Sequence, residues 1–293
     1  MHRFGLRFPC THLPADPLGM PSGPDYIGKL RSNRDSPATT NYIKRSRKTG
    51  ALCHCMGRGE LDMMYVMETS PFVLSYRYQY PWPLAKARRL LDDYVSGLTD
   101  QKPILRSRDV ISMDVVVTAE SAAGELHYLI GSHKLASDLT DAKVKRRITL
   151  ERDEASDAGF LYFLFSRTEA LDVAGKSAKQ IFLWGRKTDF NSSSIEARVL
   201  GNWIYKNYGG ESVARILQRA AQSLKKDVEV IYGLFSAAVN LGYLFLDISF
   251  PIRAWTDIQL IDPSEARPPW EDSKIIGHGL SKRKSTIQWA KKF

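Results

Sequence analysis

Cysteine is scarce in this chain, and long apolar runs are absent. Only three cysteines occur among 293 residues, at Cys10, Cys53 and Cys55. They are too few and too unevenly placed for a disulfide framework, so we expect reduced thiols. No apolar run reaches the roughly 18 residues that span a bilayer, and the opening residues MHRFGLRFPC have no signal-type apolar core. These absences argue against a disulfide-rich secreted domain and a membrane protein, and they favour a cytoplasmic protein.

The few cysteines leave one metal hypothesis open. Cys53, His54 and Cys55, together with Cys10 and His12, offer soft ligands that zinc accepts. A Cys-x-Cys pair matches no common zinc-finger spacing, however, and the alternation of a β-strand accounts for the same residues more simply. We therefore favour the strand over the zinc site.

Charge is abundant and unevenly distributed. The chain has 42 Lys and Arg against 32 Asp and Glu, a formal net charge of +10. Residues 1–60 hold ten basic residues against four acids, and residues 274–293 hold six against none. Such segments suit a polyphosphate partner, because each neutralised phosphate releases counterions. A solvated, disordered tail is an equally good explanation of either segment alone.

The basic ends supply the candidate DNA-binding residues. Tyr42 and Trp289 lie among the charges, where aromatic rings can rest on sugars or bases. The candidates near the front are Lys44, Arg45, Arg47, Lys48 and Arg58. The candidates for binding a partner through the tail are Lys282, Arg283, Lys284, Lys291 and Lys292.

Composition and periodicity divide the chain into four parts. Residues 1–50 are rich in Pro, Gly, Ser and Arg and predict a basic, partly disordered arm. Residues 51–187 alternate β-runs with helices and predict one α/β domain. Residues 188–273 begin with the polar break KTDFNSSS and then become helical, and residues 274–293 form a basic tail.

The second part predicts an α/β fold with a mixed central sheet. Amphipathic stretches predict helices over residues 59–69, 83–98 and 140–159, the last capped by Thr140 or Asp141. Alternating or wholly apolar stretches predict strands over residues 72–82, 109–119, 125–135 and 160–166.

Three polar residues interrupt these apolar elements. Asp114 lies between Met113 and Val115 in a β-run, where an ionised carboxylate is costly unless a cation compensates it. Lys134 ends the next β-run, and Glu60 opens the helix over residues 59–69. Each residue has a plainer explanation on a solvent-exposed face or in a helix first turn. Together they are the set that a Mg²⁺-dependent phosphodiester hydrolase needs.

Several ordered motifs extend this hypothesis to a family. They are GALCHCMGRGELDMMYVME, SPFVLSYRYQYPW, ISMDVVV, YLIGSHKLASDL and ITLERDEASDAGFLYFLFSRTE, ahead of a helix ending IFLWGR. In this order, the segment from Gly50 to Trp184 resembles the TnsA endonuclease subunit of heteromeric Tn-seven-like transposases. The resemblance covers about half of the chain and implies a restriction-endonuclease-like core.

The resemblance implies a site and a cofactor. It makes Glu60, Asp114 and Lys134 the catalytic residues, with Mg²⁺, for which Mn²⁺ should substitute. It places the metal ligands at Glu60, Asp114, Ser132 and the main chain of His133, with Glu151 and Gln79 as possible supporting residues. Ser132 stands where the family usually has a glutamine, and Tyr78 stands where the family often has an acid. Serine is a weaker ligand, which leaves open whether one or two metals bind.

The resemblance also implies a role in transposition. In this family the subunit hydrolyses the 5′, non-transferred strands of double-stranded DNA at the transposon ends. An integrase-type transposase (TnsB-like) cuts and joins the 3′ ends, and an AAA+ ATPase (TnsC-like) regulates the assembly. An inactive or weakened subunit that bridges these partners is the alternative for this chain, and an unrelated restriction or repair nuclease is a weaker third possibility.

The third part of the chain is expected to be winged-helix-like. Helices are predicted over residues 194–208, 210–225 and 227–242, followed by strands over 243–250 and 253–262. The third helix is mostly apolar, with Val230, Ile231, Leu234, Phe235, Ala238 and Val239. Because it offers few side chains that read bases, we expect this domain to contact proteins, and the resemblance implies that these are the AAA+ and transposase partners.

Overall fold

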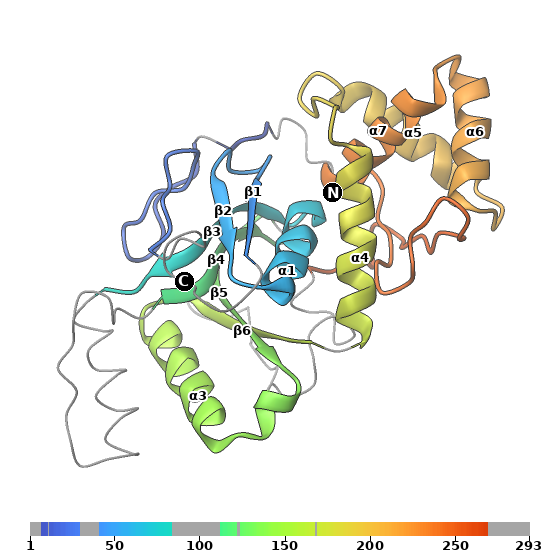
Figure 1. The fold of residues 1–293 in the computed structure, drawn as a ribbon. Coiled ribbons are helices and arrows are strands. Elements are labelled where there is room, and N and C mark those ends of the chain that lie inside the picture. Colours follow the sequence, from blue (N-terminus) through green and yellow to red (C-terminus); the bar gives the residue numbers. More distant parts are fainter. Residues whose placement is uncertain are drawn as a thin grey trace, which may run out of the picture.

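The computed structural model describes residues 7–10, 12–29, 41–83, 112–121, 124–167 and 169–268 (Figure 1). Most of the helix predicted over residues 83–98 lies outside these ranges, as does the basic tail with Lys282, Arg283, Lys284, Lys291 and Lys292. No helix among the described residues is long and apolar enough to span a membrane.

The centre of the molecule is a four-stranded sheet. Its strands are β3 (Val73–Pro81), β4 (Ser112–Glu120), β5 (Leu126–Leu135) and β6 (Leu161–Arg167), in the order β3-β4-β5-β6. The first two pairs are antiparallel and the pair of β5 and β6 is parallel. A parallel pair needs a long crossover connection, which here contains a helix. The predicted α/β fold with a mixed sheet is confirmed.

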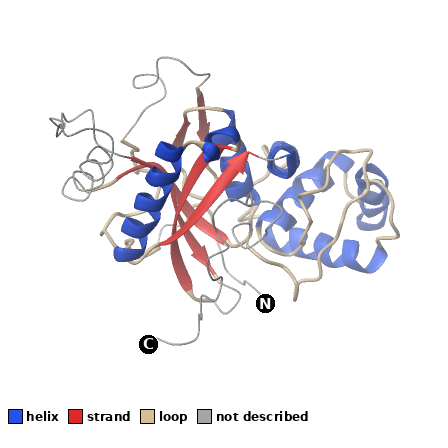
Figure 2. Ribbon diagram, turned by 90° about the horizontal axis from the view of Figure 1, so that it is seen from below, coloured by secondary structure: helices blue, strands red, loops and turns tan. Residues whose placement is uncertain are grey.

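Helices cover both faces of this sheet (Figure 2). On one face, α1 (Arg58–Thr69) and α4 (Glu169–Trp184) pack on Val115, Val117 and Leu129. On the other face, α3 (Ala142–Asp157) packs on Val116 and Ile130. Successive strand residues point to opposite faces, so the unbroken apolar run of β4 buries both of its sides. Asp141 caps α3 by accepting hydrogen bonds from the main-chain amides of Lys143 and Val144, after a short 3-10 turn at Ser137–Thr140.

Some of the described N-terminal residues contact this domain directly. Arg77 donates from Nε to the carbonyl of Pro21, and the hydroxyl of Tyr26 donates to the carbonyl of Tyr78. Strands β1 (Tyr42–Arg45) and β2 (Leu52–Cys55) form an antiparallel hairpin, which the predicted boundary at residue 50 would divide. The residues near position 20 are held on the sheet domain because Arg77 is buried there and the carbonyls of residues 20 and 21 accept hydrogen bonds from its guanidinium.

The C-terminal lobe contains the three predicted helices. They are α5 (Ser194–Asn207), α6 (Val213–Leu224) and α7 (Val228–Asn240), which share one apolar core. The strands predicted over 243–250 and 253–262 are wrong as continuous strands. The two segments meet at a single antiparallel bridge, Leu246 to Leu260. The Asp247 carboxylate accepts from the amide and hydroxyl of Ser249, and the turn that this makes ends the pairing.

Helix α4 joins the two lobes. It packs against α1 in the sheet domain and against α7 in the C-terminal lobe, and it lies between them in Figure 1. Its buried Ser177 donates to the carbonyl of Phe250 and accepts from the amide of Ile252. The segment that follows α7 is therefore held on α4 by main-chain hydrogen bonds.

Candidate functional site

Asp114 and Lys134 meet on neighbouring strands, β4 and β5. Lys134 Nζ lies 3.6 Å from Asp114 Oδ2 and donates to the His133 carbonyl at 3.1 Å. The same Asp114 oxygen accepts the His133 amide at 2.7 Å. About a fifth of each charged side chain is exposed, 23% for Lys134 and 20% for Asp114, so both are accessible to a ligand. The predicted pairing of this acid and this lysine is present in the fold.

Glu60 faces this pair from the first turn of α1. Its Oε2 accepts the amide of Met56 at 2.9 Å and the side-chain amide of Gln79 at 3.0 Å. Burial, and then repulsion from Asp114, raises the pKa of Glu60 to about 8. The negative charge of Asp114 therefore acts on the Glu60 carboxylate, as expected where a cation is to be held.

Gln79, which holds the Glu60 carboxylate, has an unusual backbone conformation itself. Its φ of 50° lies in the left-handed region, which residues other than glycine rarely adopt. Its side-chain amide donates to Glu60, its side-chain oxygen accepts from Ser112 Oγ, and its carbonyl accepts the amide of Lys29 at 2.8 Å. Such backbone strain is found where the surroundings fix a residue for function. Gln79 was predicted as a supporting residue, and the structure places it in contact with Glu60.

Ser132 and Glu151 form a second group beside Lys134. Ser132 Oγ donates to Glu151 Oε2 at 2.7 Å, Arg147 Nε lies 2.5 Å from Oε1, and the Tyr162 hydroxyl donates to Oε2 at 3.2 Å. Burial disfavours the charge of Glu151, but Arg147 and Lys134 outweigh it, so the pKa of Glu151 lies below its ordinary value. The Ser132 hydroxyl is thus bonded to a carboxylate on α3.

The His133 side chain points to the side of β5 opposite to Ser132 and packs against Gly59 of α1. A methyl group added to Gly59 would lie 2.0 Å from His133 Nε2. The absence of a side chain at Gly59 therefore lets α1 approach the strand closely, which brings Glu60 to the site. The main chain of His133, rather than its imidazole, contacts Asp114 and Lys134.

The donor set suits a hard divalent cation better than zinc. The described residues contain no cluster of three or more His, Cys, Asp or Glu side chains placed to hold a metal ion. Glu60 and Asp114 provide two carboxylates, and the carbonyl of His133 accepts from the same Lys134 ammonium that lies beside Asp114. Magnesium is commonly held by one or two carboxylates and keeps several waters, so these oxygen donors fit it. Cys53 and Cys55 are buried, free thiols of β2, where burial raises the pKa of each, an environment that fits the strand interpretation.

The predicted DNA-binding residues separate into two groups. Lys44 and Arg45 are exposed on β1, and Arg58 is partly exposed and paired with Asp62 at 2.9 Å. Lys48, by contrast, is buried, with Nζ donating to the carbonyls of Ser70 and Val73. An ammonium enclosed in this way has no open side for a phosphate.

Arg47 is half-buried, and the fold also uses its guanidinium. Its guanidinium lies over the rings of Phe182 and Phe190, at 4.1 and 4.9 Å, and donates to the Phe182 carbonyl. Burial lowers its pKa. We correct the prediction for Arg47 and Lys48, because the fold uses both cations to hold its own main chain. A charge count along the sequence carries no signal that separates them from Lys44 and Arg45.

Three residues of the site were not predicted. Ser112 bonds to Gln79, while Arg147 and Tyr162 bond to Glu151. Only Arg147 had a sequence signal, since it lies four residues before Glu151 on one face of the predicted helix.

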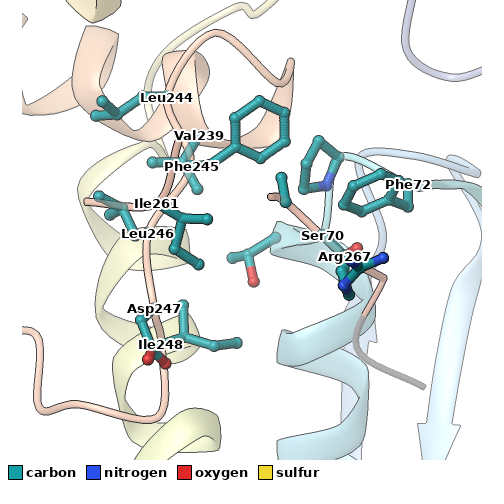
Figure 3. Close-up of a pocket in the computed structure, with 13 residues that line it drawn as sticks. Ser70, Phe72, Val239, Leu244, Phe245, Leu246, Asp247, Ile248, Ile261 and Arg267 are labelled. Atoms are coloured by element: carbon teal, nitrogen blue, oxygen red, sulfur yellow. The ribbon is translucent and has the colours of Figure 1, made fainter. Parts of the chain in front are cut away.

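The cavity in Figure 3 lies apart from this site. It has a volume of about 70 Å³ and lies between the end of α1 and the segment that follows α7. Phe72 and Phe245 flank it, with ring centroids 6.1 Å apart. Its lining is mainly apolar, and it contains none of the predicted site residues.

Comparison with known proteins bears on the family of this chain. No family model matches this chain. The chain is similar to the transposition protein TnsA of transposon Tn7 from Escherichia coli, with 25% identity over 219 residues. The aligned region is 74% of this chain and 74% of TnsA, so it extends well beyond the site. This similarity confirms the resemblance to TnsA that the ordered motifs indicate.

Proposed function

We propose that this protein is the DNA endonuclease subunit of a Tn7-like transposon and that Glu60, Asp114 and Lys134 form its active site. The observation that carries the proposal is the contact between Asp114 and Lys134 on adjacent strands, with Glu60 close enough to be repelled by Asp114. The similarity to TnsA supports transposition as the setting. The mixed sheet supports a restriction-endonuclease-like core.

Magnesium is the cofactor that we propose, with manganese able to replace it. Glu60, Asp114 and the His133 carbonyl would hold it, and when bound it would supply Lewis-acid stabilisation and a more acidic bound water. The protein's own contribution is to keep these oxygens in place. Gln79 and the Met56 amide hold the Glu60 carboxylate, and the His133 amide holds that of Asp114.

Lys134 acts in this proposal as a cation rather than as a base. Burial favours its neutral form, but Asp114 and Glu151 outweigh burial and raise its pKa. A lysine with a raised pKa stays protonated near neutral pH and is a poor general base. Its ammonium is suited to bind the scissile phosphate and to stabilise the additional negative charge of the pentacovalent transition state.

Glu151 is proposed as a supporting acid. Ser132 is shorter than the glutamine that the family resemblance leads us to expect, and its hydroxyl donates to the Glu151 carboxylate. The negative charge of Glu151 raises the pKa of Lys134 and so helps to keep its ammonium protonated. Arg147 in turn holds Glu151.

We further propose that cleavage takes place on the 5′, non-transferred strands at the transposon ends, within an assembly with TnsB-like and TnsC-like partners. The C-terminal lobe is the proposed partner-binding domain. Its order of helix, helix, helix and paired extended segments supports a winged-helix-like arrangement, because Ser212 bridges to Asp257 and Leu246 bridges to Leu260.

The test is to map transposition products in cells or in a reconstituted reaction with wild type, Asp114→Ala and Lys134→Ala. A working nuclease site predicts a shift from simple insertions to cointegrates in both variants. The alternative is an architectural subunit without nuclease activity, for which both variants would give wild-type products. Ser132, with its hydroxyl bonded to Glu151, is the observation that keeps this alternative worth testing.

A further inference from the structure

Helix α6 carries a positively charged face that the proposed chemistry does not use. Residues 212–226 contain four Lys or Arg and no Asp or Glu. The apolar residues of α6 are buried in the C-terminal core, among them Ile216, Leu217 and Ala220. We call the opposite face the α6 strip; it comprises Arg215, Gln218, Arg219, Gln222, Lys225 and Lys226.

Four members of the α6 strip, Arg215, Gln218, Arg219 and Gln222, lie on one side of α6, because residues three or four apart align along a helix. Lys225 and Lys226 follow directly after the end of the helix at Leu224. All of them are exposed except Lys226, which is half-buried. Lys225 follows the helix in a left-handed conformation, which ends α6 and turns the chain toward α7. In Figure 1, α6 lies at the outer edge of the C-terminal lobe, away from the sheet.

Two of the four cations are partly balanced by acids on neighbouring segments. Arg219 Nη1 lies 2.5 Å from Glu211 Oε1, and its guanidinium lies 5.8 Å from the Trp203 ring centroid. Lys226 Nζ lies 2.7 Å from Glu196 Oε1. These pairs hold the two side chains in place while leaving them 45% and 32% exposed. Surface ion pairs of this kind are weak, so a phosphate can compete for the same cations.

The chemistry of the strip favours a nucleic acid over a protein partner. Protein interfaces are usually anchored by apolar or aromatic side chains, and the α6 strip has none. Its residues are cations and amides, which donate hydrogen bonds to phosphate oxygens. The start of α7 is the contrasting surface, where exposed Val228 and Val230 alternate with Asp227 and Glu229. That acidic, apolar surface suits a protein and would repel DNA.

We propose that the α6 strip binds the phosphate backbone of duplex DNA. A helix of twelve residues is about 18 Å long, and a DNA strand has a phosphate roughly every 3.4 Å along its axis, so the strip spans several phosphates. Trp255, 77% exposed, adds an aromatic surface beside the start of α6, because the carbonyls of Ala254 and Thr256 accept the amides of Ala214 and Val213. The inference rests on the proposed function only in taking DNA as the substrate.

The experiment measures binding of the full-length protein to a labelled 30-base-pair duplex by fluorescence anisotropy, without divalent metal and over a range of salt concentrations. The test variant is Arg215→Gln/Lys225→Gln. The matched control, Lys176→Gln/Lys187→Gln, removes two exposed cations from α4 and the segment after it. Both variants lower the net charge by the same amount, so a difference between them reports position and not charge alone.

We expect the α6 variant to bind about tenfold more weakly or worse at 0.1 M salt, and the slope of log K against log salt to fall by about two. The control should change far less, and the charge-preserving variant Arg215→Lys/Lys225→Arg should bind like wild type. Equal losses in the test and control variants, or no loss in the test variant, would overturn the proposal. The same variants are also tested for binding to polyglutamate, which stands for an acidic protein. If the α6 variant keeps its affinity for DNA but loses binding to polyglutamate, the proposal is overturned and an acidic protein is identified as the ligand.

Failure of this proposal is distinguishable from failure of the proposed nuclease function. The binding assay includes Asp114→Ala, which removes an acid of the proposed active site but leaves α6 intact. That variant is expected to bind the duplex at least as tightly as wild type. If Asp114→Ala loses cleavage but binds DNA normally, the result supports the proposed active site and says nothing about the α6 strip. If the α6 variant loses DNA binding, the result supports the strip and says nothing about the active site.

Discussion

Replacing Glu60 by glutamine should stabilise the metal-free protein at pH 8. Glutamine has nearly the same shape, and its oxygen can still accept from Met56 and Gln79, which both bond to one oxygen of Glu60. What it removes is the negative charge that burial and Asp114 oppose. The substitution therefore isolates the electrostatic cost of the site.

The magnitude follows from the pKa of Glu60. In the folded protein this pKa is raised from 4.5 to about 8, so between these values the folded form holds a proton that the unfolded chain has lost. Folding then takes up a proton, and the free energy of unfolding should fall as the pH rises from about 5 to 8. Each pKa unit corresponds to about 1.4 kcal/mol, which makes the loss on the order of 4 kcal/mol if Glu60 alone titrates.

The assay is urea denaturation of chelator-treated protein at pH 5.5 and pH 8, for wild type and Glu60→Gln. Wild type should lose stability between the two values, and the variant should lose at least about 2 kcal/mol less. Added Mg²⁺ should restore the stability of wild type at pH 8 and have little effect on the variant. Equal pH dependence in the two proteins would refute the argument that Glu60 is held in an unfavourable charged state.

Three further substitutions test the contacts around the site. Gly59→Ala should destabilise the protein by about 2 kcal/mol or more in urea denaturation, because the added methyl meets the ring of His133. Gly57→Ala is the control and should have a much smaller effect, because a methyl group there meets nothing within 4 Å. Lys48→Met should cost about 3 kcal/mol by the same measurement, since it leaves two buried carbonyls without their donor, and a neutral result would indicate a water in place of the ammonium. Glu151→Gln should lower the pH at which cleavage reaches its maximum rate if Glu151 keeps Lys134 protonated, and an unchanged pH profile of cleavage would remove Glu151 from the proposed site.

Local patterns were sufficient to predict the main elements. The apolar run of β6, the alternation of β3 and the Asp141 cap of α3 each report interactions between residues that are close in sequence. Asp114 and Lys134 could also be predicted, because a polar residue inside a buried strand needs a partner and the next strand supplies one. Short turns make consecutive strands neighbours, so their pairing is nearly a local property.

Contacts between distant residues were not predictable in this way. Arg47 and Lys48 read as surface cations, yet both are enclosed by main chain and rings from other elements. The partners of these two cations lie outside the window in which periodicity is read. The predicted terminal strands fail for a local reason instead, since the turn that Asp247 makes with Ser249 limits the pairing to one bridge.

The sequence by itself determined the α/β class, the order of the acid, acid and lysine, and the resemblance to TnsA, because these depend on residue type, spacing and short-range pairing. Only the tertiary structure decided how the site works as a unit. It turned Gln79 into a left-handed conformation that holds Glu60, and it joined Ser132 to Glu151. It also turned the cations of α6 outward as one strip. Burial and electrostatic coupling arise from groups far apart in the chain, and they exist only once the chain has folded.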